Sequence, residues 1–344
     1  MSTSPHVFAF GKIVPQFVSE NGSRKSANRS NFATLCGLSF AELVLKPGAF
    51  REPHWHANAN ELTYCRSGSA LVTVFSNGNQ HDSFTIGQGE MFFVPNGYLH
   101  SIENIGDDDA EFFVAFTDEM PEDFGMSGAV GCMSASVMGN TWNLPTSAAE
   151  GLRYSPQDIV FGPTDGKPEV PASAFFPNHY KLSLEAMLPL IGNEHGSVRV
   201  ARKQFWPVLE GIAMYSLHIS GTGMREPHWH PRTAEMGYVL TGRARMTLLS
   251  PGAKVDTYIL EAGDMYFIPK AYPHHIENLE NEETRFLIFF DQPMPEDIGY
   301  TGGLATFPGR IVAPTIGCTK ETLPKIPNYP ADLLLVEKVN PVTP

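Results

Sequence analysis

An all-β fold, in which one barrel or sandwich domain occurs twice, is the fold class that this sequence predicts. The first observation is that the stretch Arg51-Glu52-Pro53-His54-Trp55-His56 returns unchanged at residues 225–230, an offset of 174 positions (228 − 54). The second is the density of turn residues, with 31 Gly and 28 Pro in 344 residues. Short apolar runs separated by such turns, without a long helical period, are typical of barrels and sandwiches.

The strands of the two copies follow in the same order. In the first copy, apolar runs predict strands at residues 40–45, 61–65, 70–75, 82–86, 90–94 and 112–116. Asn77-Gly78 is a strong hairpin signal within this series. In the second copy, the corresponding runs predict strands at residues 198–200, 213–219, 235–240, 244–249, 258–260, 265–268 and 286–290. Each copy therefore has enough strands for a barrel of its own.

The expected domain boundaries follow from the composition between the copies. Residues 1–150 are expected to form the first barrel, and residues 176–344 the second barrel with a Pro-rich C-terminal tail. Residues 151–175 are rich in Pro and Gly and are interpreted as a linker. Domains of this size are large enough to bury separate cores.

Charge and targeting signals exclude several classes of partner. A formal net charge of −13 argues against nucleic acid or an anionic membrane. The N-terminal stretch lacks the pattern of a signal peptide, and no apolar run is long enough to span a bilayer, so a cytoplasmic protein is expected. The four cysteines contain no C-x-x-C pair and are interpreted as structural thiols.

The duplicated stretch predicts one metal site in each copy. Residues two apart on a strand point to the same face, so His54 and His56 are expected to face inward and Trp55 outward. A glutamate and a third histidine recur at the same offset. Three nitrogens and one oxygen without a thiolate suit a divalent first-row metal with open positions. The predicted ligands are His54, His56, Glu61 and His100, and His228, His230, Glu235 and His274.

A single His-x-His on a strand is more often an accident of the core or the surface than a pair of ligands. Here, six of the twelve histidines fall in the duplicated pattern, with two glutamates at the matching offset. Chance does not account for that coincidence, and a metal site is the preferred interpretation.

These residues are similar to the two motifs of the cupin family. The first motif is matched by Gly48, His54, His56, Glu61 and Gly68, and the second by Gly89, Pro95, Gly97, His100 and Asn104. Residues 222–242 and 263–278 repeat both motifs, with Thr222 and Ala271 in place of two turn glycines. Two tandem cupin barrels (double-stranded β-helices) with Arg-Glu-x-His-Trp-His in both halves resemble the oxalate decarboxylase branch of the bicupins.

The resemblance implies a manganese ion in each barrel, with Fe²⁺ as the alternative, and a small carboxylate such as oxalate as substrate. It further implies that Arg51 and Arg225 pair with that carboxylate. The guanidinium is suited to this task because its planar fork matches a carboxylate. Dioxygen as a partner and a homo-oligomeric assembly are also expected from the resemblance.

Two features of the resembled decarboxylases are absent. Their Ser-Glu-Asn-Ser lid is replaced here by Asp118-Glu119-Met120-Pro121-Glu122-Asp123, and the glutamate of their last barrel strand is replaced by Ile288, or by Val114 in the first copy. Glu122 or Asp123 is a candidate proton-transferring acid, with Glu296 or Asp297 as its counterpart in the second copy. Because Met-Pro-Glu-Asp returns at residues 294–297, we favour its interpretation as a helix start, with proline at the first position and acids in the first turn.

Three functions are compatible with these patterns. The first is a manganese-dependent enzyme that decarboxylates or oxidises oxalate or a related small carboxylate. The second is an iron-dependent dioxygenase, since the same ligands serve iron. The third is a non-catalytic metal-binding bicupin, which the retention of all eight ligands disfavours.

Overall fold

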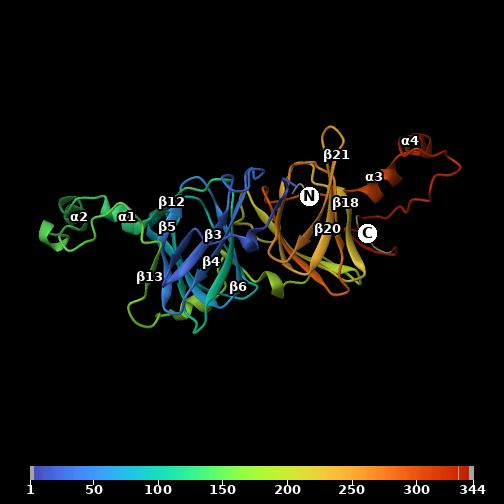
Figure 1. Cartoon of the computed structure of the whole chain (residues 1–344). Coiled ribbons are helices and arrows are strands. Elements are labelled where there is room, and N and C mark those ends of the chain that lie inside the picture. The colour runs from blue at the N-terminus through green and yellow to red at the C-terminus, as the bar shows by residue number, and fades with distance from the viewer. Residues whose placement is uncertain (1–3, 332, 341–344) are drawn as a thin grey trace. The chain divides into compact units, whose positions relative to one another are not determined.

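The structure is a computed structural model that describes residues 4–331 and 333–340. The chain divides into two compact units, and each is built around one copy of the repeat (Figure 1). Each unit contains two antiparallel sheets that enclose an apolar core. The predicted all-β fold of two tandem barrels is therefore confirmed.

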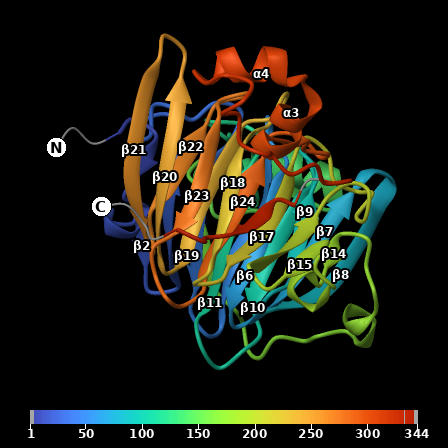
Figure 2. The ribbon, with the colours of Figure 1, turned by 90° about the vertical axis from the view of Figure 1, so that its right-hand side faces the viewer.

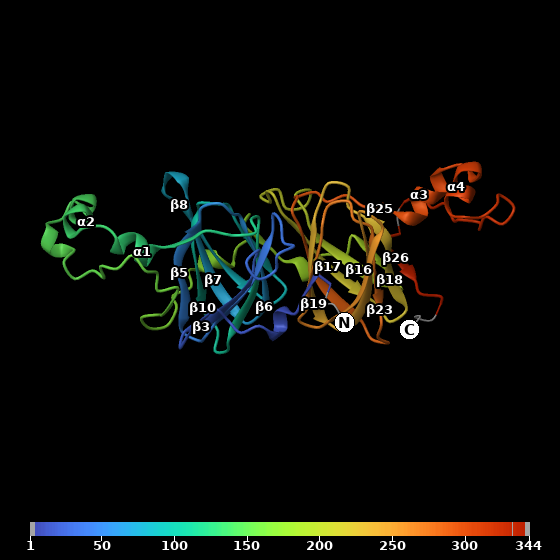
Figure 3. The same ribbon diagram turned by 45° about the horizontal axis from the view of Figure 1, so that its top comes forward.

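The first barrel consists of a six-stranded and a seven-stranded sheet, with β5, β10 and β7 side by side in the former (Figure 3). The strands of the six-stranded sheet, in spatial order, are β12 (Asp123–Gly125), β5 (Ala49–His56), β10 (Leu99–Asn104), β7 (Ser69–Ser76) and β8 (Gln80–Gly87), with β13 (Phe161–Pro163) also paired to β5. The second sheet contains β14 (Lys181–Leu182), β9 (Met91–Val94), β6 (Glu61–Ser67), β11 (Ala110–Phe116), β4 (Ser39–Leu45), β3 (Gly22–Ala27) and β2 (Phe17–Ser19).

The second barrel repeats this arrangement (Figure 2). One sheet contains β21 (Lys254–Glu261), β20 (Arg243–Ser250), β23 (His274–Asn278), β18 (Gly223–Trp229) and β25 (Ile298–Gly299), with β26 (Leu335–Glu337) also paired to β18. The other contains β1 (Val7–Phe8), β22 (Met265–Ile268), β19 (Glu235–Thr241), β24 (Thr284–Phe290), β17 (Ala213–Ile219), β16 (Gly196–Ala201) and β15 (Ile191–Asn193).

A pair of short helices follows the last long strand of each barrel (Figure 1). They are α1 (Met126–Gly131) and α2 (Ala135–Trp142) after the first, and α3 (Tyr300–Thr306) and α4 (Gly309–Thr315) after the second. Single 3-10 turns occur at η1 (Phe10–Lys12), η2 (Asn77–Asn79), η3 (Thr146–Ala148), η4 (Ala172–Phe175) and η5 (Leu184–Ala186). Among the described residues, no helix has the length and apolar character needed to cross a membrane.

The expected helix start at Pro121-Glu122-Asp123 is wrong. Asp123 begins β12 and lies opposite His56 in the sheet, and the helix starts only at Met126. In the second copy, Asp297 precedes β25, and α3 starts at Tyr300. At the positions where the first turn of a helix was expected, the chain pairs with the strand that carries the first predicted ligand histidine, β5 or β18, and its backbone makes hydrogen bonds to that strand instead.

The compact units do not follow the expected boundaries at residues 150 and 175. Residues 4–12 pack with the second copy, where Val7 of β1 lies opposite Tyr266 of β22. Lys181 of β14, 174 positions after Val7 (181 − 7), takes the equivalent place beside β9 of the first barrel. Within the expected linker, β13 pairs with β5. Each of these segments supplies hydrogen-bond partners to a strand that would otherwise lie at a sheet edge.

We expect Phe10→Ala to destabilise the second barrel by about 3–5 kcal/mol, because the side chain is fully buried (0% exposed) and packs edge-on against Tyr238. Amide hydrogen exchange resolved by strand would report this as a lower opening free energy in β19 and β22. The matched control is Val14→Ala, which truncates a side chain that is 79% exposed and should change little. Loss of protection in β9 and β6 instead would contradict the assignment of this segment to the second barrel.

Candidate functional site

The strand β5 presents its two histidines to the interior of the first barrel. His54 and His56 are buried, whereas Trp55 faces outward and stacks on Phe124 at 5.6 Å between ring centroids. His100 of β10 lies directly opposite His54 in the sheet. The predicted alternation of inward histidine and outward tryptophan is confirmed, and Trp229 likewise packs against Tyr300 in the second barrel.

In each barrel, the four predicted ligand residues come together. Their ligand atoms all lie within 4.8 Å of one another, and every member is buried. In the first barrel, Glu61 Oε2 is 3.1 Å from Nε2 of both His56 and His100. In the second, Glu235 Oε2 is 2.7 Å from His230 Nε2 and 3.3 Å from His274 Nε2.

Main-chain carbonyls determine which nitrogen of each histidine faces the cluster. The Nδ1–H of every one of these histidines donates to a carbonyl oxygen, which leaves Nε2 directed at the glutamate. The Nδ1–oxygen distances are 2.8 Å for His54, 3.3 Å for His56 and 3.1 Å for His100, and 2.7 Å, 2.9 Å and 2.9 Å for His228, His230 and His274.

In the first cluster, the electrostatics favour the cation-binding forms of Glu61 and His54. Burial alone would raise the pKa of Glu61, but the charges and hydrogen bonds of His100 and His56 outweigh it and hold the pKa well below its usual range. Burial, reinforced by the charge of Arg51, lowers the pKa of His54 well below its usual value. A carboxylate and a neutral imidazole are both ligand forms.

The donor set therefore fits a divalent metal. Three imidazole nitrogens and one carboxylate oxygen converge on one point in each barrel. The Nε2 atom of His274 is buried and makes no hydrogen bond to any described residue. A buried polar atom without a partner is costly unless something else satisfies it, and a metal ion would do so.

A β-bulge brings an arginine to the same interior. Arg51 and His54 are three residues apart, so strict alternation would place them on opposite faces of β5. On the partner strand, however, Ile102 pairs with Arg51 and His100 with His54, so two steps on β10 match three on β5. The extra residue lies at Glu52-Pro53, and as a result the side chains of Arg51 and His54 both point inward. The same shift separates Arg225 from His228 in the second barrel.

Each buried arginine is paired with an aspartate that the sequence offered only as one of two candidate acids in each copy. Arg51 Nη2 lies 2.8 Å and 2.6 Å from the two carboxylate oxygens of Asp123, and Arg225 is paired with Asp297. Burial would raise the pKa of Asp123, but the charges of Arg51, His56 and Arg24 outweigh it and lower the pKa. The repeat of Met-Pro-Glu-Asp was the only sequence signal for these residues.

Glu122, the candidate acid, does not enter the site. Its side chain is exposed, and its main-chain carbonyl accepts the Nδ1–H of His56. Because Asp123 is in the strand pair with β5, alternation turns Asp123 inward and Glu122 outward.

Each arginine also donates a hydrogen bond to the main-chain carbonyl of a residue in a strained turn. Val160 has φ of +66° and Leu334 has φ of +57°, in the left-handed region that β-branched and bulky residues avoid. Their carbonyl oxygens accept from Arg51 Nη1 at 3.3 Å and from Arg225 Nη1 at 3.1 Å. Such strain costs on the order of 1–3 kcal/mol and persists where the surroundings over-determine it. The two positions are 174 residues apart (334 − 160) and were not recognised in the sequence.

The surroundings of the two clusters differ. Beside His56 and Asp123, the first barrel has a cavity of about 130 Å³ that Arg24 and Ala41 also line. At the positions of Arg24 and Ala41, 174 residues on, the second barrel has Val198 and Tyr215, which line a hollow of about 20 Å³ around its cluster. The first site therefore has more room and more positive charge beside its metal ligands.

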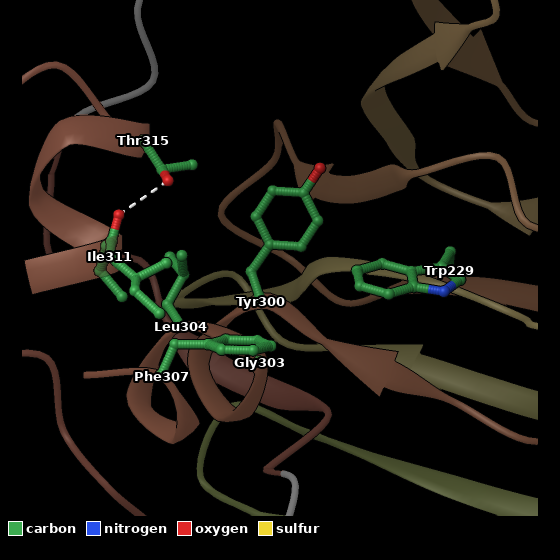
Figure 4. Close-up of a pocket in the computed structure, with 8 residues that line it drawn as sticks. Trp229, Tyr300, Gly303, Leu304, Phe307, Ile311 and Thr315 are labelled. Atoms are coloured by element: carbon green, nitrogen blue, oxygen red, sulfur yellow. Dashed lines mark hydrogen bonds between the residues drawn. The ribbon is translucent and has the colours of Figure 1, made fainter. Parts of the chain in front are cut away.

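A larger cavity of about 350 Å³ lies outside the second barrel (Figure 4). Its lining comes from α3, α4 and Trp229, and Phe307 and Ile311 give it an apolar surface. Among the described residues that line it, the phenol of Tyr300 is the only titratable side chain, and they supply no group of the kind that metal or acid-base chemistry needs.

Comparison with known proteins agrees with this geometry. The Cupin family profile matches residues 9–148 and 182–322. Oxalate decarboxylase OxdC of Bacillus subtilis (strain 168) is 30% identical over 291 residues, which cover 80% of this chain and 72% of that protein. A probable oxalate decarboxylase of Arthroderma benhamiae is 27% identical, over 84% of this chain and 73% of that protein.

A solved structure of Bacillus subtilis oxalate decarboxylase, a protein described with Mn(II) centres, superposes with a TM-score of 0.84. The match has 25% identity and covers 98% of this chain and 90% of that one. With both repeats matched by the family profile and most of OxdC spanned, this chain belongs to the cupin family, as an oxalate decarboxylase-like bicupin enzyme.

Proposed function

We propose that this protein is a manganese-dependent enzyme that acts on oxalate or a closely related small carboxylate. One observation carries the proposal: in each barrel a buried arginine beside the candidate metal ligands already holds a carboxylate, that of Asp123 or Asp297. A small carboxylate substrate would replace the aspartate on the same guanidinium. The pairing is charge-assisted and joins a buried guanidinium to a partly buried carboxylate, which makes it strong and geometrically selective.

The first barrel is the better candidate for the reaction. Its cavity adjoins His56 and Asp123, and Arg24 adds a second positive charge that would attract an anion despite the net charge of the chain. In this barrel, His54, His56, Glu61 and His100 would hold the metal, which would polarise the bound carboxylate. Arg51 would orient the substrate and stabilise its charge as the C–C bond breaks.

Asp123 is the acid that we assign to proton transfer, in place of Glu122. Once a substrate displaces it from Arg51, Asp123 loses the main charge that opposes the effect of its burial, and its pKa rises toward the range in which it can carry a proton. Decarboxylation converts hydrogen oxalate into formate and carbon dioxide. Asp123 would take up the proton of hydrogen oxalate and deliver it to the carbon atom that becomes formate. Oxidation instead consumes dioxygen and two protons per oxalate dianion and yields two carbon dioxide molecules and hydrogen peroxide.

Iron is the alternative metal, because the same three imidazoles and one carboxylate also suit Fe²⁺ in oxygen-using enzymes. A non-catalytic metal-binding bicupin would need neither the buried arginine nor the cavity beside the ligands. The cytoplasmic location and the homo-oligomeric state stay predictions.

The proposal is tested by the products formed from oxalate. We expect protein loaded with Mn²⁺ to release carbon dioxide from oxalate, together with formate if it is a decarboxylase or hydrogen peroxide if it is an oxidase. Formate and peroxide would be quantified with enzyme-coupled assays, with and without dioxygen. Metal-loaded His56→Ala protein serves as the control. Absence of both products at every metal loading would refute oxalate as the substrate.

Arg51→Lys should lower kcat/KM by about 10²-fold while metal content stays unchanged. An ammonium cannot reproduce the planar contact of a guanidinium, and loss of one preorganised donor is worth about this factor. Arg225→Lys is the matched control in the second barrel and should cost less, because that cluster has little free space around it. Equal activity of wild type and Arg51→Lys would show that the arginine does not hold the substrate.

His56→Ala is expected to lower the metal content from two ions per chain to one. The second cluster belongs to a barrel with its own core, so it should retain its ion. Elemental analysis after desalting gives the stoichiometry, and the corresponding His230→Ala variant is the counterpart. A full complement of two ions in His56→Ala would argue against the assigned ligands.

A further inference from the structure

The metal-ligating glutamates of the two barrels accept hydrogen bonds from different residues. The two donors occupy opposite members of one pair of facing residues on neighbouring strands. In the first barrel, the Thr63 hydroxyl donates to Glu61 Oε1 at 2.8 Å. In the second, the phenol of Tyr266 donates to Glu235 Oε1 at 2.6 Å. In both cases, the other oxygen, Oε2, faces the histidines.

The donor has changed strand between the repeats. Thr63 of β6 lies opposite Phe92 of β9, and the equivalent pair 174 positions later is Gly237 of β19 opposite Tyr266 of β22. The hydroxyl group has thus moved from one side of the strand pair to the other. Each barrel keeps one hydroxyl donor and one aromatic ring at this pair.

The glycine is what makes room for the phenol. A Cβ atom added at Gly237 would lie 2.1 Å from the Cε1 and Cζ atoms of Tyr266. A threonine in the position of Thr63 and a tyrosine oriented like Tyr266 are therefore mutually exclusive. In both barrels, one hydroxyl group donates to Oε1 of the glutamate. The hydrogen bond is therefore the same in the two barrels, although a different residue supplies it.

We propose that Tyr266 and Thr63 are positioning residues for the metal-ligating glutamates, and that each keeps its glutamate bound to the metal through Oε2 alone. This inference rests on the proposed metal binding of both clusters. A hydrogen bond to the second oxygen fixes the orientation of a ligating carboxylate and disfavours coordination through both oxygens. Loss of such a partner to a metal ligand typically weakens metal binding 10–100-fold.

The test uses the metal affinity of the second barrel alone. In a His56→Ala background, the second cluster is the remaining site, and its Mn²⁺ dissociation constant is measured by competition with a chelator. We expect Tyr266→Phe to raise this constant 10–100-fold, because the ring still fills the space over Gly237 while the donor is lost. Tyr258→Phe is the matched control: its phenol contacts Met246 Sδ rather than a carboxylate, and the constant should not change.

A transplant of the first-barrel arrangement separates positioning from packing. Gly237→Thr combined with Tyr266→Phe recreates the Thr63 and Phe92 pair. The phenylalanine ring must leave the orientation of Tyr266 to clear the new Cβ atom, and a variant in which it does so should recover most of the lost affinity. The reciprocal arm is Thr63→Val in a His230→Ala background, which should weaken Mn²⁺ binding by the first cluster to a similar degree. Circular dichroism confirms that each variant is folded.

The outcomes distinguish this inference from the function on which it rests. If the His56→Ala background itself binds no Mn²⁺, the assignment of the second cluster as a metal site fails. If that background binds Mn²⁺ and Tyr266→Phe binds it equally well, the metal site stands and the positioning role is refuted. An equal loss of affinity in Tyr258→Phe would also refute it.

Discussion

An ionised carboxylate inside an apolar barrel is the constraint on which both sites depend. Glu61 and Glu235 are almost completely buried, and an isolated charge at such a place would be too costly to keep. Each is surrounded by imidazoles on one oxygen and by a single hydroxyl donor on the other. The carbonyl groups that orient the imidazoles leave the Nε2 atoms facing this carboxylate, and a divalent cation between them would bind both kinds of lone pair and balance the charge.

The strands β5 and β18 carry most of this arrangement. Two histidines on one face follow from ordinary alternation, but the arginine joins them only because a bulge inserts an extra residue before the first histidine. Segments from far along the chain then close the site. β12 brings Asp123 to Arg51, and the turn before β13 brings the carbonyl of Val160. The substrate-binding group that we propose is thus held by three separate stretches of sequence.

Duplication has preserved the ligands while their surroundings changed. The first barrel has Arg24 and Ala41 where the second has Val198 and Tyr215, and its cavity is correspondingly larger. The hydroxyl on the glutamate also comes from a different strand in each barrel. Such differences around identical ligands are the means by which a protein can tune two metal sites separately, since neighbouring groups control ligand basicity and solvent access.

The sequence by itself determined the all-β class, the duplication, the eight candidate ligands and the outward direction of Trp55. These are properties of strand alternation and of a constant offset, both of which can be read along the chain. Only the tertiary structure decided that Asp123 rather than Glu122 faces Arg51, because Asp123 lies in a strand where a helix start was expected. It also decided that residues 4–12 complete the second barrel, and that β13, which lies in the expected linker, pairs with a strand of the first barrel. Pairings of this kind join residues 67 or more positions apart (123 − 56 for Asp123 and His56), and no local spacing encodes which sheet edge will take up a short strand.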